Sequence, residues 1–491
     1  MPSSLWRRHW KLAVGVPVAL VLLVGTIGAR RVGPFTSSVL PGKRVGEDIK
    51  GRVKLFDRST IHEFALTYEQ VDYDSLLKSY FGDGTKDVMR ADLTIDGMLL
   101  PAVGIRLKGN ATLRNLRDEN GNAAPGGAFP GGGGRVGGGF PGGGPPGGGG
   151  FGTALSVAEP EDLPWLVSID EFVKDRLYEG HRELAIRPPQ NITQTTVLNE
   201  ALSLSMIDAA GEPASDFLYT TLRVNGGTPT LRLVLQNPDD SLAADEIKGK
   251  GVIYKSLSTG NFSYRGDDPT AYEGSFKIMN RKKSADLAPV IGLIKWVDGA
   301  DDFAFRDGLA ARIDVESFAR YCAFQNLLLN FDDMAGPGQN YLVYYDLSTT
   351  KFQIGTWDMN ISFSGNASQG PYDAGGFGGF GGGGPPQGDL QPTAGVAFPR
   401  GGHKLKERFL ASGTFRKVYE AQYRALYLRF FVGGEANRLL DKLAATLAIV
   451  PSNAADPAKV TADVEQLRTA LTNRLNGLAN NVVITGATPA S

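Results

Sequence analysis

Three polar side chains near the middle of the chain have the types and spacing that phosphoryl transfer requires. Asp332 follows a long apolar segment, Asn340 precedes an alternating one, and Asp358 stands directly behind Trp357. Phosphoryl transfer uses one carboxylate to position or deprotonate the acceptor hydroxyl, and an Asn with a second Asp to hold Mg²⁺ on the phosphates. Mg²⁺ takes few protein carboxylates, because water and phosphate oxygens complete its shell. A single Asp behind a tryptophan is therefore compatible with a metal site.

Asp358 also has an ordinary structural explanation. It lies in the strand-like stretch "KFQIGTWDMNISF", residues 351–363, whose apolar side chains include Ile354 and Trp357. A buried carboxylate is unfavourable unless it is paired or bound to a cation. A capping or turn aspartate explains the position without any chemistry, so the metal role needs a partner elsewhere in the chain.

The elements that must position these residues change character along the chain. Period-two alternation predicts strands in the first half, as in 91–110 and 216–236, with turns at Asp96–Gly97 and at "NGG". A helix is predicted near 193–211 and should end at Gly211. In the second half, helical spacing dominates on both sides of a predicted hairpin at 341–359.

This layout predicts an α+β fold with two lobes. A β-rich N-lobe covers residues 55–258, a mostly helical C-lobe covers 259–482, and 483–491 form a tail. We expect the site at the junction of the two lobes.

Composition excludes one class of partner. Of 491 residues, 51 are Lys or Arg and 52 are Asp or Glu, so the chain lacks the basic excess typical of nucleic-acid binding. The single Cys322 lies in an apolar helical run and is interpreted as a core residue rather than a nucleophile. No intrachain disulfide is possible, so cysteine usage does not indicate a compartment.

The N-terminus is interpreted as a membrane anchor. A basic start precedes 18 uncharged residues from Leu12 to Ala29, and Arg30 and Arg31 follow. That length lies at the lower limit for a spanning helix, and a cleaved secretory signal is the alternative. Residues 1–32 are assigned to this segment and 33–54 to a tether. Basic residues flank the apolar segment on both sides, so they decide its orientation in the membrane only weakly. We expect the rest of the protein to lie outside the cytoplasm.

Two glycine- and proline-rich inserts, residues 126–152 and 375–402, interrupt the two predicted lobes. Neither can bury a core, so both are expected to lack regular structure. They are either inert surface insertions or segments that border the same cleft as a lid or docking surface.

The chain resembles the CotH (spore coat protein H) kinase family, whose members are atypical kinases with a protein-kinase-like fold. The matching stretches, in family order across residues 55–480, include "PAVGIRLKGNAT", "LNEALSLSMIDAAGEPA", "GVIYKS", "NLLLNFDDMAGPGQNY" and "GTWDMNISF". The resemblance implies transfer of the ATP γ-phosphate to serine or threonine of a protein substrate or coat partner, with ATP and Mg²⁺ as cofactors.

Carried over residue by residue, the resemblance implies roles for the three polar side chains. Asp332 would be the catalytic carboxylate, Asn340 would support it or the metal, and Asp358 would bind the metal together with Asn360. The remaining implied residues would bind the nucleotide: Arg106, Lys108, Gly109, Asn110, Gln236 and Lys255. For Lys108, a solvated strand residue is the alternative.

Three positions depart from the family pattern. Asn360 replaces the second Asp of the family's "WDxD", Leu235 replaces a Glu, and Leu163 replaces a Lys. A catalytically degenerate surface or scaffold protein is therefore the alternative function. ATP is also scarce outside a bacterial cell, which favours that alternative for an extracytoplasmic body.

Overall fold

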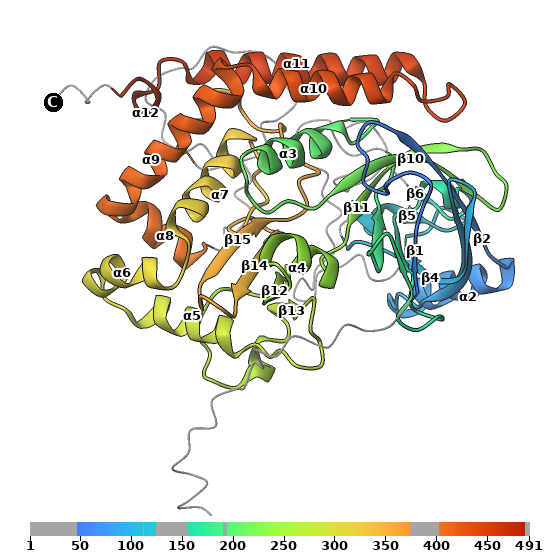
Figure 1. Cartoon of the computed structure of the whole chain (residues 1–491), viewed down its shortest axis with the longest axis horizontal. Helices are drawn as coiled ribbons and strands as arrows, with labels where there is room; N and C mark the ends of the chain where they lie inside the picture. The colour runs from blue at the N-terminus through green and yellow to red at the C-terminus, as the bar shows by residue number, and fades with distance from the viewer. Residues whose placement is uncertain (1–46, 111, 124–154, 190–193, 374–401, 487–491) are drawn as a thin grey trace, which may run out of the picture.

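A computed structural model of the chain describes residues 47–110, 112–123, 155–189, 194–373 and 402–486 (Figure 1). The expected anchor, most of the expected tether and, apart from Gly402, both glycine-rich inserts lie outside these ranges. Within the ranges, no helix combines the length and the apolar character that crossing a membrane requires.

Seven strands close into a barrel on one side of the molecule (Figure 1). Neighbouring strands are antiparallel except β2 and β10, which pair in parallel and close the barrel. In barrel order the strands are β10 (Phe217–Val224), β11 (Thr230–Gln236), β9 (Glu183–Ile186), β7 (Trp165–Ser168), β4 (Met98–Leu107), β3 (Met89–Ile95) and β2 (Ile61–Thr67). Their inward apolar residues form a closed core.

The two turns predicted from sequence are confirmed in this barrel. Asp96 and Gly97 have φ of 49° and 79°, and Asn225 and Gly226 have φ of 47° and 76°. Two successive residues with positive φ form the type I′ turn, whose twist matches that of the flanking strands. Asp-Gly and Asn-Gly adopt this geometry readily, which is why the sequence identified both hairpins.

A second, four-stranded sheet lies beside the barrel and has the order β13-β12-β14-β15. Its strands are β12 (Gly251–Ser256), β13 (Phe276–Ile278), β14 (Tyr341–Asp346) and β15 (Phe352–Thr356). The hairpin predicted at 341–359 is confirmed as β14–β15. The boundary predicted at residue 258 does not coincide with the break between sheets, because β12 pairs with β14.

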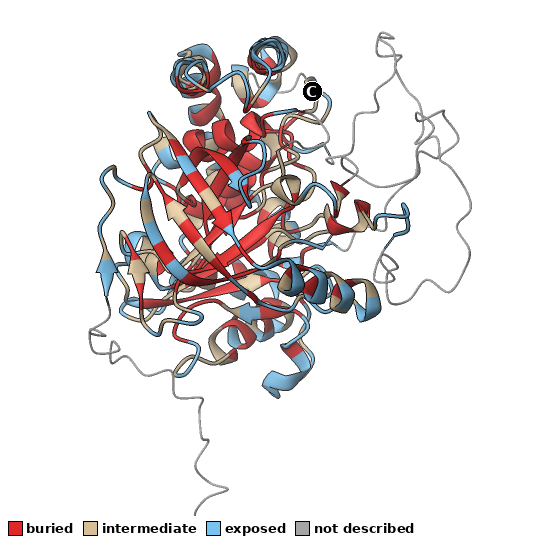
Figure 2. Ribbon diagram, turned by 90° about the vertical axis from the view of Figure 1, so that its right-hand side faces the viewer, coloured by how far each residue is buried: buried red, intermediate tan, exposed pale blue. Residues whose placement is uncertain are grey.

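Helices surround the second sheet and one end of the barrel, and buried residues concentrate in the sheets and in the helices behind them (Figure 2). The helices are α2 (Gln70–Asp83), α3 (Leu198–Ala209), α4 (Asp240–Ile247), α5 (Ala288–Gly299), α6 (Asp302–Gly308), α7 (Val315–Leu327), α8 (Lys404–Ala411), α9 (Gly413–Tyr427), α10 (Glu435–Leu447), α11 (Pro457–Leu478) and α12 (Val482–Thr485). Cys322 on α7 is buried, in agreement with its interpretation as a core residue.

Several short elements complete the fold, some of them near the ends of the described chain. β1 (Asp48–Ile49) pairs with β8 (Leu177–Tyr178), so the last residues of the expected tether belong to the fold. A second short pair joins β5 (Leu116–Arg117) to β6 (Leu155–Ser156). The predicted tail likewise begins inside α12.

Helix α11 ties two parts of the fold together. The fully buried guanidinium of Arg474 donates to the Leu327 and Asn326 carbonyls at the end of α7 and to the carbonyls of Ala367 and Gln369. About three turns earlier on α11, the Asp463 carboxylate accepts from Thr195 and Thr196, just before α3. α11 therefore holds α3 and α7 in a fixed relation.

Candidate functional site

The candidate site lies at one end of the β14–β15 hairpin. Tyr341 pairs with Thr356 across the two strands. Asn340 directly precedes the first of these strands and Asp358 follows the second by two residues, so the register brings both to the same end of the hairpin.

Asp332 is held in the loop between α7 and β14. Its Oδ1 accepts from the Gly338 N–H, and its Oδ2 accepts from the Asn340 amide at 2.9 Å. A Cβ at Gly338 would lie 2.8 Å from Asn340 Nδ2 and against the Asp332 carboxylate. The loop therefore requires glycine at this position to bring its backbone against the carboxylate.

The surroundings of Asp332 bring its pKa close to neutral pH. Burial raises the pKa of Asp332 to about 7, and the negative charge of Asp358 adds to the rise, whereas the hydrogen bonds from Gly338 and Asn340 oppose it. A general base works best when its pKa is close to the working pH. The contribution from Asp358 also means that the two carboxylates are close.

Asp358 has the distant partner that the sequence required. Its backbone lies in the left-handed region with φ of 59°, and its Oδ1 accepts from Arg187 at 2.7 Å. Non-glycine residues adopt this conformation uncommonly, and Asp is among those that tolerate it. The turn role is therefore combined with an ion pair to a residue 171 positions away.

Arg187 joins Asp358 to a second buried carboxylate. The same Arg187 Nη2 that contacts Asp358 donates to Glu200 in the first turn of α3, 2.5 Å away. Glu200 is only 1% exposed. Burial raises its pKa, although Arg187 acts in the opposite direction. Burial would also raise the pKa of Asp358, but Arg187, Lys255 and Lys108 together hold that pKa below its ordinary value.

Sequence reasoning missed Arg187 and Glu200 as site residues. A signal for Glu200 was present, since it is the one charged residue in the apolar run 197–207. Arg187 directly follows the buried strand β9, which is a weaker signal. What the sequence could not supply is the contact between them and Asp358, because the three come from separate elements.

Two lysines predicted to bind a nucleotide lie over the same tryptophan ring. The Lys255 and Lys108 ammonium groups are 4.4 Å and 5.3 Å from the Trp357 ring centroid. Burial lowers the pKa of Lys255 to about 8 and that of Lys108 well below its ordinary value. The charge of Arg187 lowers both pKa values further, Lys255 also lowers that of Lys108, and Asp358 opposes both shifts. The geometry does not support a freely solvated Lys108.

The segment after β4 is held by a lysine that sequence reasoning did not single out. Lys86 Nζ donates to the Gly109 carbonyl at 2.5 Å and to Asn110 Oδ1 at 2.6 Å. Gly109 has φ of 101°, a conformation that favours glycine. Arg106 lies two residues before Lys108 on β4, and its charge lowers the pKa of Lys86, Lys108 and Lys255. These predicted nucleotide residues therefore lie at the cation cluster.

Gln236 does not join this cluster. It is buried, and its amide nitrogen donates to Ser241 Oγ and Asp245 Oδ2 while its oxygen accepts from the Asp216 N–H. These contacts occupy Gln236 in structural bonds beside α4. Neighbouring strand residues alternate sides, so proximity in sequence to a family position does not fix where this side chain points.

The three residues that depart from the family pattern occupy different structural settings. Leu163 packs in the barrel core and Leu235 in the large core shared with the helices. Asn360 lies two residues after Asp358, and its backbone carbonyl accepts from the Asn199 amide on α3. The segment that carries Asp358 is thus tied to α3 by a backbone contact as well as by Arg187.

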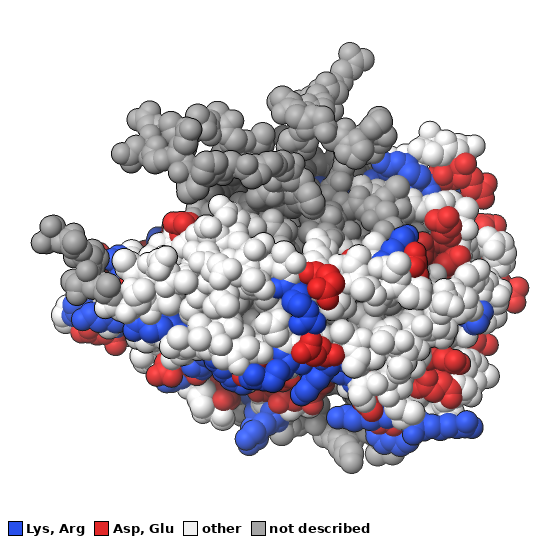
Figure 3. All heavy atoms as spheres, turned by 90° about the horizontal axis from the view of Figure 1, so that it is seen from above, with Lys and Arg blue, Asp and Glu red and all other residues white. Residues whose placement is uncertain are grey.

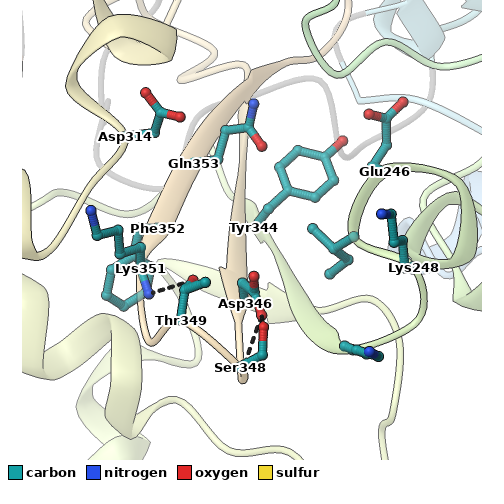
Figure 4. Close-up of a pocket in the computed structure, with 12 residues that line it drawn as sticks. Glu246, Lys248, Asp314, Tyr344, Asp346, Ser348, Thr349, Lys351, Phe352 and Gln353 are labelled. Carbon is teal, nitrogen blue, oxygen red and sulfur yellow. Dashed lines mark hydrogen bonds between the residues drawn. The ribbon is translucent and has the colours of Figure 1, made fainter.

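A hollow of about 470 Å³ lies at the opposite end of the β14–β15 hairpin (Figure 4). Tyr344, Asp346, Lys351 and Gln353 line it from one face of the hairpin, and Glu246 borders it from α4. None of the predicted site residues lines this hollow. On β14, residues 341–343 lie between Asn340 and Tyr344, the lining residue that is nearest to Asn340 along this strand.

Acidic and basic side chains are interspersed on the face seen from above in Figure 3. This face shows no broad basic patch among its described residues, in keeping with the balanced composition.

A family model described as CotH kinase protein matches residues 160–478. The match includes Arg187, Glu200, Lys255, Asp332 and Asp358, whereas Lys108 lies before its first residue. Among curated proteins, none matches the chain.

Proposed function

The chain belongs to the CotH kinase family, and on that premise we propose that it transfers the γ-phosphate of ATP to serine or threonine hydroxyls of a protein. The observation that carries the proposal is the gathering of Asp332, Asn340 and Asp358 beside Lys108 and Lys255. Positioning and electrostatic stabilisation are nearly all that phosphoryl transfer asks of a protein.

In this proposal Asp332 orients the acceptor hydroxyl and takes its proton. Its pKa of about 7 suits that role near neutral pH. Asn340 and the Gly338 N–H hold both carboxylate oxygens, so the acceptor meets a base of fixed orientation. Such pre-organisation contributes much of the rate enhancement. A base with many orientations is seldom aligned with the acceptor hydroxyl, so fewer of its encounters lead to reaction.

The residues present fit Mg²⁺ as it is used with nucleotides. No group of three or more His, Cys, Asp or Glu that could hold a metal occurs within the described ranges, and Mg²⁺ needs no such group when phosphates supply ligands. Asp358 would hold it together with the amide oxygens of Asn340 and Asn360. The Asn340 nitrogen already donates to Asp332, which leaves its oxygen for a cation. Bound there, Mg²⁺ neutralises charge on the transferred phosphate.

The cations at the site suit the phosphates of a nucleotide. Lys108 and Lys255 form no ion pair with any described residue, and burial has already lowered their pKa values. Desolvated cations interact more strongly with an incoming anion than solvated ones do. Gly109 and Asn110, held by Lys86, contribute the backbone segment that would cover the phosphates.

We further propose that residues 12–29 anchor the protein in a membrane and that its body is extracytoplasmic, where it meets a protein substrate or a surface partner. The uncharged length of this segment and its basic flanks support the anchor. Protease protection of a C-terminal epitope in intact cells tests the orientation, and a protected epitope contradicts an extracytoplasmic body.

The test of activity compares the purified full chain with Asp358→Ala. The wild-type chain should incorporate labelled phosphate into itself or into a serine-rich protein, and the variant should lose this activity, since it lacks the carboxylate for the metal. Equal background incorporation by both contradicts the proposal.

The second candidate function is a degenerate family member that acts by binding alone. It is favoured by the ion pair that already engages Asp358 and by Asn360 in place of a carboxylate. Thermal melting with Mg·ATP separates the two candidates, because a ligand at 100 times its Kd adds about 2.7 kcal/mol of stability. An unchanged melting temperature supports the binding protein.

A further inference from the structure

Strand β13 places a second lysine directly opposite Lys255. In the antiparallel β12–β13 pair, Lys255 is the partner of Lys277, so both side chains leave the same face of the sheet. Like charges directly opposite each other destabilise a sheet. This pairing is therefore unfavourable in the protein alone and becomes favourable when an anion lies between or beside the two ammonium groups.

The positive charge continues from Lys277 toward the surface. Lys277 and Lys282 are exposed, whereas Lys255 is partly buried. Burial lowers the pKa of Lys277, and the charges of Lys282 and Arg106 lower it further, with Glu183 acting in the opposite direction. Neither Lys277 nor Lys282 forms an ion pair with a described residue. A row of unneutralised cations thus leads outward from the Trp357 ring.

We propose that Lys277 and Lys282 bind an acidic segment of the protein substrate, next to the acceptor hydroxyl. This inference rests on the proposed function and adds the substrate class. Lys108 and Lys255 lie inward at Trp357, where the nucleotide phosphates belong. The two outer lysines are solvated, and solvated charges on the rim of an interface select and steer a partner of opposite charge.

An edge-strand lysine also has a structural use, because it discourages pairing with a second chain. β13 is the edge strand of its sheet. That use accounts for a lysine somewhere on β13, but it gives no role to Lys282, which lies beyond the strand, and no selectivity among peptides. Peptide selectivity therefore separates the two explanations.

The experiment measures binding of fluorescein-labelled peptides to the purified full chain by fluorescence anisotropy, without nucleotide. Three peptides of equal length alternate serine with Glu, Gln or Lys. The variants are Lys277→Gln, Lys282→Gln and their combination. Lys351→Gln is the matched control, since Lys351 is an exposed lysine at the far end of the same sheet.

The Glu peptide should bind more tightly than the Gln peptide, and the Lys peptide most weakly. Each substitution should weaken Glu-peptide binding about two- to five-fold, the range of an exposed charge pair, and the combined variant more. Lys351→Gln should leave it unchanged. Higher salt should reduce the preference, because exposed charges are screened.

Two results overturn the inference. One is equal affinity for the three peptides, which leaves the lysines with an edge-strand role only. The other is a combined variant that keeps its peptide affinity but loses the stabilisation by Mg·ATP, which assigns both lysines to the nucleotide. Binding is measured without catalysis, so a chain that selects the Glu peptide but transfers no phosphate refutes the proposed kinase activity and leaves the acidic-partner surface intact.

Discussion

Replacing Arg187 with Gln should destabilise the fold because it removes the cation between two carboxylates. Glu200 is 1% exposed and would remain buried without its countercharge. Asp358 is less affected, since its side chain is 29% exposed and Lys255 and Lys108 remain beside it. Breaking a buried pair costs about 3–5 kcal/mol. Because one carboxylate rather than two is left uncompensated, we expect the free energy of unfolding to fall by about 3 kcal/mol, the lower end of this range.

The loss should depend on pH in a defined direction. Without Arg187, the pKa of Glu200 rises further above its value of about 4.3 in the unfolded chain. The folded variant then binds a proton that the unfolded chain releases, so its free energy of unfolding falls as pH rises above about 4. The difference between wild type and Arg187→Gln should therefore be larger at pH 8 than at pH 5.

Urea denaturation at pH 5 and pH 8, followed by tryptophan fluorescence and circular dichroism, measures this loss. Adding Glu200→Gln should recover most of it, leaving about 1 kcal/mol for the lost hydrogen bonds. Arg468→Gln is the control, because its pair with Asp441 is exposed and worth less than about 1 kcal/mol. A variant as stable as wild type at pH 8, or a loss that is the same at both pH values, refutes the reasoning.

Three further predictions concern the loop that carries Asp332, the proposed base. Gly338→Ala should reduce phosphate transfer more than about ten-fold and also weaken the melting shift with Mg·ATP, because the added Cβ displaces the Asp332 carboxylate and Asn340, a proposed Mg²⁺ ligand. Transfer should rise with pH and level off above about 7, since Asp332 acts in its deprotonated form; a profile flat from pH 5 to 8 contradicts its role as base. Lys406→Met should lower the free energy of unfolding by about 3–5 kcal/mol in urea denaturation, because it leaves the buried Asp333 carboxylate unpaired; a loss below about 1 kcal/mol contradicts this.

Much of the local structure was predictable because it depends on neighbours in sequence. The Asp96–Gly97 turn, the helix that ends near Gly211 and the β14–β15 hairpin follow from turn chemistry and periodicity. The mixed α and β character followed from the same patterns. The sequence placed residues 251–256 in the β-rich N-lobe and named no partner strand for them. Their pairing with β14 joins residues about 90 positions apart, and no local pattern encodes that choice.

The site was predictable in its residue types and less so in its contacts. Asp332, Asn340 and Asp358 are adjacent in the chain and meet at one hairpin end. Arg187 was missed because an arginine after a buried strand has many ordinary uses, and only the fold brings it to Asp358. Gln236 bonds to a residue of α4 instead of joining the cation cluster, because the side to which a strand residue points depends on register.

The hydrogen bonds by which α11 connects α3 and α7 have a consequence for the order in which parts of the fold form during synthesis. Arg474 lies far beyond the Asp332 loop in the sequence, yet it holds the end of α7 from which that loop departs, and Asp463 holds the approach to α3. A ribosome delivers both residues after the barrel strands and the β14–β15 hairpin. The nascent chain therefore has the barrel and the hairpin long before it has a fixed site, and a polypeptide released early, before residue 474, would lack the tie between α3 and α7.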